Sequence, residues 1–330
     1  MPRFRKKLAG AAAAAALCLL GAGTASTTPA SAASSLEWAA LGDSYTAGAI
    51  HAAGPFEQPR DGCQRTTEAY PEVIRRDLGS LVSLKNVSCG NATIADVDHR
   101  AQEPIGNELH IPGLIDHHDP DYPFPPVPPQ IDALSPGTDL VTVGVGGNSL
   151  GFGEILGKCV ALGPTGGVGS HPCEDYYKSG ETESLEHRLE RVRTEYDRML
   201  SAIHAKSPFA KVITVGYPTV IPDNTAECTY GNLLQFATIR RPDLDWLRTS
   251  ALEPLNAVIR HVSAAHGDRY VDIYDSSKGH SVCAGQEKWV EGIKERLFND
   301  QNPDTWALVH PNVRGQANAA AQVEDAVLGG

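Results

Sequence analysis

Residues 39–48 read Ala-Ala-Leu-Gly-Asp-Ser-Tyr-Thr-Ala-Gly, an apolar run that ends in a glycine, an acid and a serine. The apolar residues before Gly42 are typical of a buried strand, and the small residues after it permit a tight turn into a helix. Ser44 would therefore lie at the carboxyl edge of a strand, where open α/β sheets bind their ligands. A serine there can act as a nucleophile and can offer its backbone N–H to a developing oxyanion. The alternative is an ordinary helix N-cap, a position that serine often fills.

Two later blocks give Ser44 a catalytic context. Gly146-Gly147-Asn148 follows an apolar, β-branched run, and His310-Pro311-Asn312 lies near the C-terminus. In this order, the three blocks resemble the SGNH (GDSL-type) hydrolases, and most closely the secreted actinobacterial esterases and lipases of that superfamily. The resemblance runs from about residue 36 to residue 322. It implies an α/β fold, a three-layer α/β/α sandwich with a mostly parallel, flavodoxin-like central sheet.

The same resemblance assigns roles to individual residues. Ser44 would be the nucleophile and His310 the base, while the Ser44 backbone and the Asn148 side-chain amide would bind the oxyanion. A further oxyanion donor is expected in the block that begins at Cys89, where the family usually has glycine two residues after the cysteine. Here Gly90 comes one residue after it and Asn91 stands at the expected place. Because the chemistry needs a backbone N–H and asparagine tolerates left-handed conformations, either residue can serve, unless the block is only a disulfide-stapled turn.

The acid that orients the catalytic histidine is the main departure from the family pattern. Most members carry Asp three residues before the histidine, but this chain has Ala307 there, and the nearest preceding acid is Asp304. Either a backbone carbonyl near Ala307 accepts the Nδ1–H of His310, as in some similar esterases that work with a dyad, or Asp304 reaches in. We favour the carbonyl. His280 is a competing base, which we rank below His310 because the His-Pro-Asn block fits the family position.

The N-terminus predicts export. Residues 1–32 combine four basic residues, an apolar stretch and a cleavage-like Ala-Ser-Ala, as in a secretory signal peptide. We expect residues 33–330 to form a single hydrolase domain with no membrane-spanning segment. Removal of the signal changes the formal net charge from −12 to −16, which argues against nucleic acid or anionic lipid as main partners. We expect a secreted, extracellular monomer.

Six cysteines remain after the signal: Cys63, Cys89, Cys159, Cys173, Cys228 and Cys283. An even number in an exported chain favours disulfides, and the lack of any Cys-x-x-Cys pair argues against zinc. Composition alone leaves the pairing open, whereas the resemblance implies sequential pairing.

The proline-rich segment 99–130 contains His110, Asp116, His117, His118 and Asp119. These side chains could bind a metal, but they lack regular helical ligand spacing, so we expect a solvated lid or rim and neither metal nor cofactor.

Alternating elements support the same fold. Helical spacing marks residues 69–78, 185–203 and 247–265, and strand-like runs occur at 81–87, 139–145, 211–218 and 270–274. Residues 151–179 are rich in glycine and are expected to form a disulfide-stapled loop. Strands and helices in alternation predict a mostly parallel sheet.

The functional prediction is a secreted carboxylic ester hydrolase acting on lipid, acyl or polymer esters. One alternative is a polysaccharide O-acetyl esterase of the same fold. The other is a non-catalytic extracellular binding module, which would not need Ser44, Asn148 and His310 together.

Overall fold

The structure of the protein is a computed structural model that describes residues 35–49, 59–111, 115–294 and 307–329. The predicted signal peptide lies outside these residues. Five described strands form one parallel sheet in the order β2-β1-β5-β6-β7. Their bounds are β1 Leu36–Gly42, β2 Val82–Asn86, β5 Leu140–Gly144, β6 Lys211–Val215 and β7 Arg269–Val271. The strand order reverses between β1 and β5, and ligand sites of open α/β sheets lie at the carboxyl ends of strands at such a point.

Alternate residues of β1 face two separate hydrophobic cores. Ala39 and Leu41 belong to one core, whereas Trp38 and Ala40 belong to the other. Successive side chains of a strand point to opposite faces, so both faces of this sheet are apolar. Helices must therefore cover both faces.

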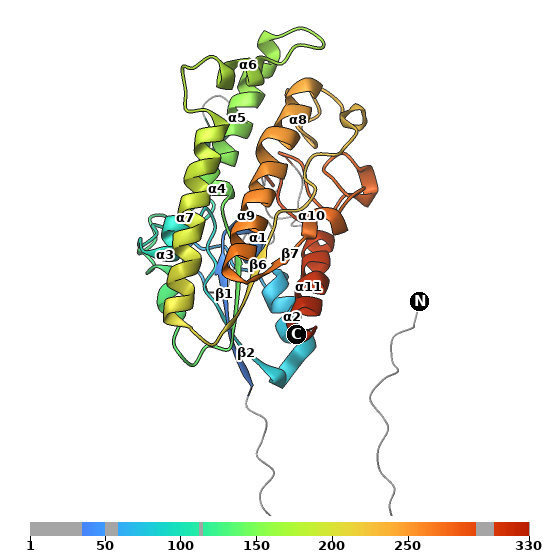
Figure 1. The fold of residues 1–330 in the computed structure, drawn as a ribbon. Coiled ribbons are helices and arrows are strands. Elements are labelled where there is room, and N and C mark those ends of the chain that lie inside the picture. Colours follow the sequence, from blue (N-terminus) through green and yellow to red (C-terminus); the bar gives the residue numbers. More distant parts are fainter. Residues whose placement is uncertain (1–34, 50–58, 112–114, 295–306, 330) are drawn as a thin grey trace, which may run out of the picture. The chain divides into compact units, whose positions relative to one another are not determined.

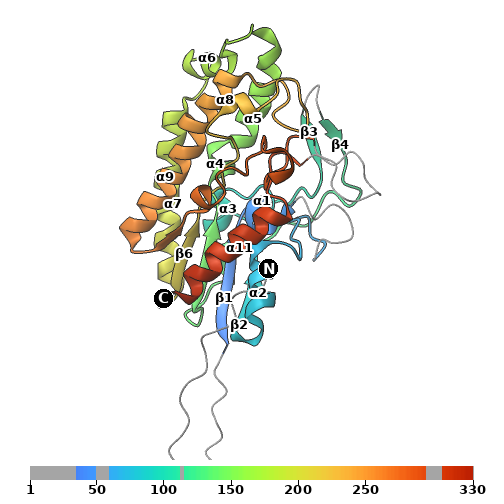
Figure 2. The ribbon, with the colours of Figure 1, turned by 90° about the vertical axis from the view of Figure 1, so that its right-hand side faces the viewer.

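Two groups of helices supply these covers and complete three layers, as Figures 1 and 2 show. The first core includes residues of α3 (Ile94–Asp98), α7 (Leu185–Lys206) and α9 (Glu253–His266). The second includes residues of α2 (Tyr70–Leu78) and α11 (Val313–Leu328). The predicted α/β/α sandwich is confirmed.

The predicted helix at 247–265 is part of a longer, interrupted one. It begins with α8 (Arg241–Leu247), passes through a π-helical turn at Arg248–Leu252 and continues as α9. Pro254 in the first turn of α9 has no N–H to donate to the preceding turn. The Glu253 N–H bonds to the Arg248 carbonyl, the wider spacing that defines the π-turn.

The prediction of a loop at 151–179 is wrong. This segment contains α5 (Phe152–Leu162) and α6 (Pro172–Lys178), joined by the Cys159–Cys173 disulfide. Helix α5 buries Ile155, Leu156, Cys159 and Val160 on one face. Its glycines at 153 and 157 have open space around them, so each costs only the propensity loss of about 1 kcal/mol. Packing of the apolar face outweighs that cost.

Two other segments also differ from the sequence prediction. The segment 99–130, expected to be a loop, contains the antiparallel hairpin β3 (Leu109–Ile111) and β4 (Ile115–His117). The strand expected at 270–274 ends at Val271, because Asp272 caps the short helix α10 (Ile273–Ser276) and accepts the Asp275 N–H.

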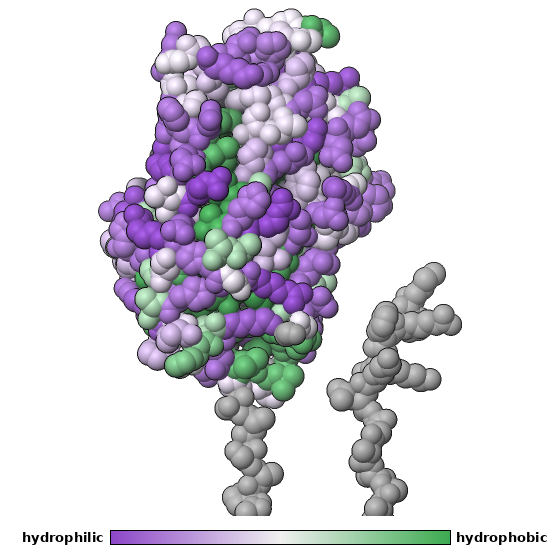
Figure 3. Space-filling view, in the orientation of Figure 1, coloured by the Kyte–Doolittle hydropathy of each residue, from purple (hydrophilic) through white to green (hydrophobic). Residues whose placement is uncertain are grey.

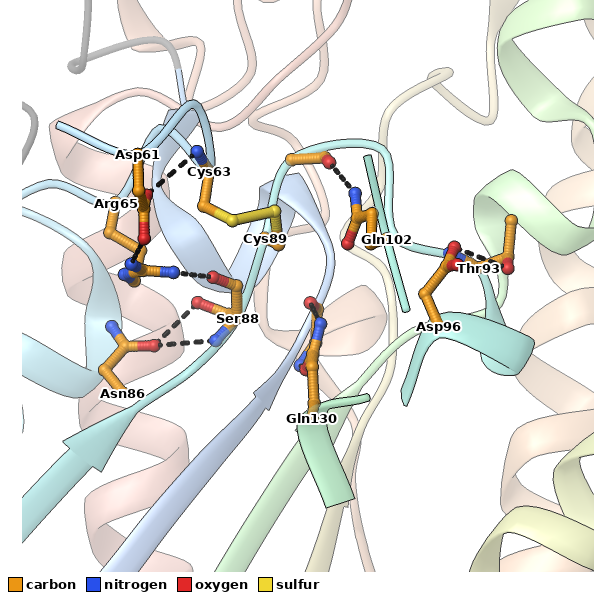
Figure 4. The surroundings of a disulfide bond; sticks show 12 residues. Asp61, Cys63, Arg65, Asn86, Ser88, Cys89, Thr93, Asp96, Gln102 and Gln130 are labelled. Atoms are coloured by element: carbon orange, nitrogen blue, oxygen red, sulfur yellow. Dashed lines mark hydrogen bonds and ion pairs between the residues drawn. A yellow bond between two sulfur atoms is a disulfide. The ribbon is translucent and has the colours of Figure 1, made fainter. Parts of the chain in front are cut away.

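All six cysteines expected in the exported chain are paired. The disulfides are Cys63–Cys89, Cys159–Cys173 and Cys228–Cys283, the sequential pattern that the resemblance implied. Figure 4 shows the first of them.

The face of the molecule drawn in Figure 3 is largely hydrophilic, with apolar residues in the groove between α7 and α9. Within the ranges that the structure covers, no helix combines the length and apolar character that a membrane span requires.

Candidate active site

Ser44 lies two residues beyond Gly42, the last residue of β1, in a turn that only glycine permits. Gly42 has φ 153°, and a Cβ there would overlap the Thr46 side chain and the Gly144 carbonyl. Asp43 then caps the four-residue helix α1 (Ser44–Ala47), its carboxylate accepting the Tyr45 N–H at 3.0 Å. Asp43 is therefore the N-cap, and Ser44 is the first helical residue. The alternative that Ser44 is itself an ordinary N-cap is wrong.

His310 lies in contact with Ser44, although the two residues are 266 positions apart. The Ser44 Oγ and the His310 Nε2 are 2.7 Å apart, a hydrogen-bond distance. The other ring nitrogen, Nδ1, lies 2.8 Å from the Ala307 carbonyl oxygen and 3.1 Å from that of Leu308. Since carbonyl oxygens only accept, the proton is on Nδ1. Nε2 is then free to accept the Ser44 hydroxyl proton.

A turn with left-handed backbone conformation before His310 brings these carbonyls to its ring. Leu308 and Val309 have φ of 47° and 61°, left-handed values that cost non-glycine residues on the order of 1 kcal/mol or more each. The turn lets the Ala307 carbonyl accept both the backbone N–H of His310, at 3.1 Å, and its Nδ1–H. Tyr45 fixes the same turn, because its hydroxyl donates to the Val309 carbonyl at 2.6 Å.

Burial lowers the pKa of His310, and the bonds to the Ala307 and Leu308 carbonyls offset this only in part. The ordinary histidine pKa is about 6.5, so the imidazole is mostly neutral at pH 7. A neutral imidazole that contacts a serine hydroxyl can accept its proton.

The structure describes only one of the two groups that were expected to orient His310. Asp304 lies outside the described residues, whereas the carbonyl near Ala307 is in hydrogen-bond contact with His310. His280, the competing base, stacks on Trp289 at 3.6 Å between ring centroids, and its Nδ1 lies 2.6 Å from the Glu287 carbonyl. Its ring is thus held in another local cluster.

The block after β2 offers one free amide. The Gly90 N–H already donates to the Cys63 carbonyl at 2.9 Å, which removes Gly90 as an oxyanion donor. Asn91 adopts a left-handed φ of 61°, and its N–H has no acceptor among the described residues. Gln102 donates to the Gly90 carbonyl at 2.6 Å, next to the Cys63–Cys89 disulfide (Figure 4). The peptide group between Gly90 and Asn91 is thus held by the Gln102 side chain, and the residue before it, Cys89, is held by the disulfide.

The remaining expected donor, Asn148, is the second residue of the short helix that follows β5. It lies in α4 (Gly147–Leu150), and its Nδ2 donates to the Ala92 carbonyl at 3.0 Å. One of the two Nδ2 hydrogens remains for a ligand. Ser149, where the family often has Asp, accepts the first backbone N–H of α3 through its Oγ, from Ile94 at 2.9 Å.

A tyrosine that sequence reasoning missed joins the blocks after β1 and β5. The Tyr217 hydroxyl donates to Asp43 Oδ2 at 2.5 Å and accepts the Gly147 N–H at 2.7 Å. Burial raises the pKa of Asp43 to about 7, although the bond from Tyr217 lowers it. The signal available in the sequence was position: Tyr217 lies near the carboxyl end of the strand predicted at 211–218, which is the sheet edge where Ser44 was expected, although β6 itself ends at Val215.

Comparison with known proteins agrees with this arrangement. Residues 40–317 match the GDSL-like Lipase/Acylhydrolase family. The chain belongs to that family. It is 31% identical to an esterase of Streptomyces scabiei, over 98% of this chain and 94% of that protein. It is also 31% identical to lipase 2 of Streptomyces coelicolor, over 99% of this chain and 98% of that protein.

Solved structures of similar proteins share the fold. The extracellular lipase of Streptomyces rimosus superposes with a TM-score of 0.61 at 21% identity, covering 88% of this chain and 100% of that one. Phospholipase A1 of Streptomyces albidoflavus gives 0.59 at 24% identity, with 88% and 99% covered. The family resemblance drawn from three short motifs is confirmed, and the protein is a carboxylic ester hydrolase of the GDSL family.

Proposed function

We propose that the protein is a secreted esterase or lipase in which Ser44 and His310 form a catalytic dyad. The observation that carries the proposal is the 2.7 Å contact between Ser44 Oγ and His310 Nε2 at the carboxyl end of β1. Nucleophile and base within hydrogen-bond reach, with the base oriented by a third group, are the geometric signature of a serine hydrolase.

In the first half-reaction, Ser44 Oγ attacks the ester carbonyl carbon and its proton moves to His310 Nε2. The negative charge forms on the former carbonyl oxygen, where the N–H groups of Ser44 and Asn91 and the Asn148 side chain would donate hydrogen bonds. Collapse of this intermediate breaks the carbon–oxygen bond of the ester. The leaving alcohol takes the proton from His310, and the acyl group stays on Ser44.

In the second half-reaction, water replaces the alcohol. His310 Nε2 accepts a water proton as the water oxygen attacks the acyl carbon, and the same proton then returns to Ser44 Oγ. The products are the free serine and a carboxylic acid.

The carbonyls of Ala307 and Leu308 would replace the usual acid in this cycle. They hold the Nδ1 tautomer, but a neutral carbonyl stabilises the transient imidazolium less than a carboxylate does. Burial of His310 increases that cost, since it disfavours the charged form. The proposal thus pairs a well-placed base with modest charge stabilisation.

Export and the substrate class rest on separate support. Three disulfides and the predicted signal peptide favour an extracellular location, where thiols oxidise. The related Streptomyces proteins are named esterase and lipase, which supports simple acyl esters or lipid esters as substrates.

A serine-directed phosphonate tests the nucleophile. We expect one equivalent to label Ser44, and Ser44→Ala to lose labelling and at least about a thousandfold of nitrophenyl ester hydrolysis. Ser201→Ala, on the exposed side of α7, is the matched control and should behave as wild type. Undiminished hydrolysis by folded Ser44→Ala would reject the proposal.

A further inference from the structure

The β3–β4 hairpin gathers histidines and carboxylates on one face. In the register of the hairpin, His110 pairs with Asp116. Glu108 lies two residues before His110, and His118 lies two residues after Asp116. Because side chains of a strand alternate with a period of two, Glu108, His110, Asp116 and His118 share one face of the hairpin. Each side of the hairpin thus contributes one histidine and one carboxylate.

The donor atoms of three of these residues converge. Glu108 Oε1 lies 2.6 Å from His110 Nε2 and 3.0 Å from His118 Nδ1, and the three ligand atoms all lie within 4.8 Å of one another. A tetrahedral zinc ion with ligands at about 2.0–2.2 Å needs donors roughly 3.4 Å apart. Both imidazoles are exposed, so small rotations of their side chains reach that spacing.

We propose that Glu108, His110 and His118 form a binding site for Zn²⁺, distinct from the catalytic centre. Two imidazoles and one carboxylate are a donor set that zinc accepts, with the fourth position left to water. The ion would replace the two protons that the histidines now direct at a single Glu108 oxygen. It would link the strand of β3 to the segment that follows β4.

Asp116 has the position of an outer-shell residue. Its Oδ1 lies 2.6 Å from His110 Nδ1 and 3.8 Å from His118 Nε2, the ring nitrogens that face away from Glu108. A carboxylate on the remote nitrogen of a ligating histidine fixes the ring and makes it a more basic ligand.

A second hydrogen bond orients the Glu108 carboxylate. Its second oxygen, Oε2, accepts the Asp119 N–H at 2.8 Å, which leaves Oε1 for the ion. The Asp119 carboxylate is buried, and it accepts from the Asn107 N–H and the Arg60 guanidinium. Both ends of the hairpin are thereby anchored before any ion binds.

Protons compete with zinc for the same nitrogens. The two imidazoles bind the ion only through a deprotonated ring nitrogen, and Glu108 binds it only as a carboxylate. Zinc binding must therefore release protons and weaken as the pH falls.

The sequence predicted no metal in this segment because helical ligand spacing was missing. The spacing is that of a strand instead, with the ligands Glu108 and His110 two residues apart before the turn, and the outer-shell Asp116 and the ligand His118 two residues apart after it. The hairpin register was the observation that the sequence alone did not supply.

Calorimetric titration of the full exported chain, stripped with a chelator and dialysed, tests the site with Zn²⁺ alone. We expect one equivalent to bind with a dissociation constant on the order of micromolar or tighter near neutral pH, and more weakly at about pH 5.5. His110→Ala and His118→Ala should each weaken binding at least tenfold, and Asp116→Asn about tenfold.

His171→Ala is the matched control. His171 also lies beside carboxylates, 2.9 Å from Asp175 and 3.9 Å from Glu174, but it is not part of the convergent set. It should bind zinc as wild type does. Failure of wild type to bind at about 100 μM Zn²⁺, or equal binding by folded His118→Ala, would overturn the proposal. Neither result depends on ester hydrolysis, so the zinc site is tested independently of the catalytic proposal.

Discussion

Leu308 and Val309 hold left-handed backbone conformations directly before His310, and the turn they form carries the carbonyls that bind its Nδ1. In the proposed dyad, the shape of this backbone turn takes the place of the usual acid. Sequence analysis could point to a carbonyl near Ala307 from the missing Asp alone. The pair of left-handed residues could not be expected, because neither leucine nor valine favours that conformation.

The pH dependence of hydrolysis should report the burial of His310. Only the neutral imidazole accepts the Ser44 proton, and burial lowers the pKa of His310. We therefore expect kcat/KM to be constant through neutral pH and to fall on acidification with an apparent pKa below about 6.5. A pH–rate profile from about pH 4 to pH 8 measures this. An acidic limb centred above about 7 would contradict it.

The two asparagines near Ser44 should respond differently to substitution, because one would act through its side chain and the other through its backbone. Asn148→Ala removes a proposed oxyanion donor and should lower kcat by about 10²- to 10³-fold. Asn91→Gly keeps the N–H and suits φ 61° at least as well, so activity should stay within about threefold. Equal losses in the two folded variants would show that the assignment is wrong.

At the scale of elements, side-chain hydrogen bonds join segments that the sequence presents separately. Tyr217, after β6, connects the turn after β1 to α4 through Asp43 and Gly147. Gln130 binds both the N–H and the carbonyl of Gly42, at 2.7 and 2.9 Å. The sheet thus fixes the strand ends, and these bonds fix the loops between them.

Tyr217→Phe should lower both stability and turnover. The change leaves the buried Gly147 N–H without its acceptor and takes a donor from Asp43, a loss of about 1–3 kcal/mol. It should also lower kcat by about tenfold with a smaller change in KM, since Ser44 and Asn148 would be less well aligned. Chemical denaturation and steady-state kinetics measure the two effects.

Tyr196→Phe is the control for this prediction. Tyr196 is also buried, and its hydroxyl has no hydrogen-bond partner within the described residues. Its removal should therefore leave stability and kcat near wild type. If Tyr217→Phe and Tyr196→Phe are indistinguishable, the Tyr217 network does not position the site.

Elements were predictable where one feature dominated their sequence. The β-branched run of β5 and the apolar period of α7 were evident, and both elements form close to the predicted bounds. In α5 the glycines suggested a loop, although the apolar residues followed helical spacing. In the β3–β4 hairpin the prolines and charges around short strands hid the period of two.

At the scale of the whole molecule, the sheet brings together residues from both ends of the chain. Ser44 follows the first strand, Asn148 follows β5, and His310 precedes the last helix, α11. Their order identified the family and, through it, the fold. The sequence could not show which amide of the second block is free, because the bond from Gly90 to Cys63 depends on the packing of two loops.

The disulfides should divide into those that serve the site and those that serve only stability. Cys63–Cys89 holds the block that carries Asn91, whereas Cys159–Cys173 joins α5 and α6. Replacing either pair by serines should cost about 3 kcal/mol in the chain-entropy model. Loss of Cys63–Cys89 should also lower kcat well below the kcat of the folded variant that lacks Cys159–Cys173. Equal kcat in both folded variants would contradict the role given to the first disulfide.

We propose that main-chain carbonyls, rather than an acid, orient His310. The most direct measurement is kcat/KM of Asp304→Ala on a nitrophenyl ester, with His310→Ala as reference and folding of both checked by circular dichroism. We predict that Asp304→Ala stays within about tenfold of wild type, a barrier increase of no more than roughly 1.4 kcal/mol, while His310→Ala abolishes hydrolysis. A drop of about a thousandfold in folded Asp304→Ala would contradict the dyad and indicate a triad of Ser44, His310 and Asp304.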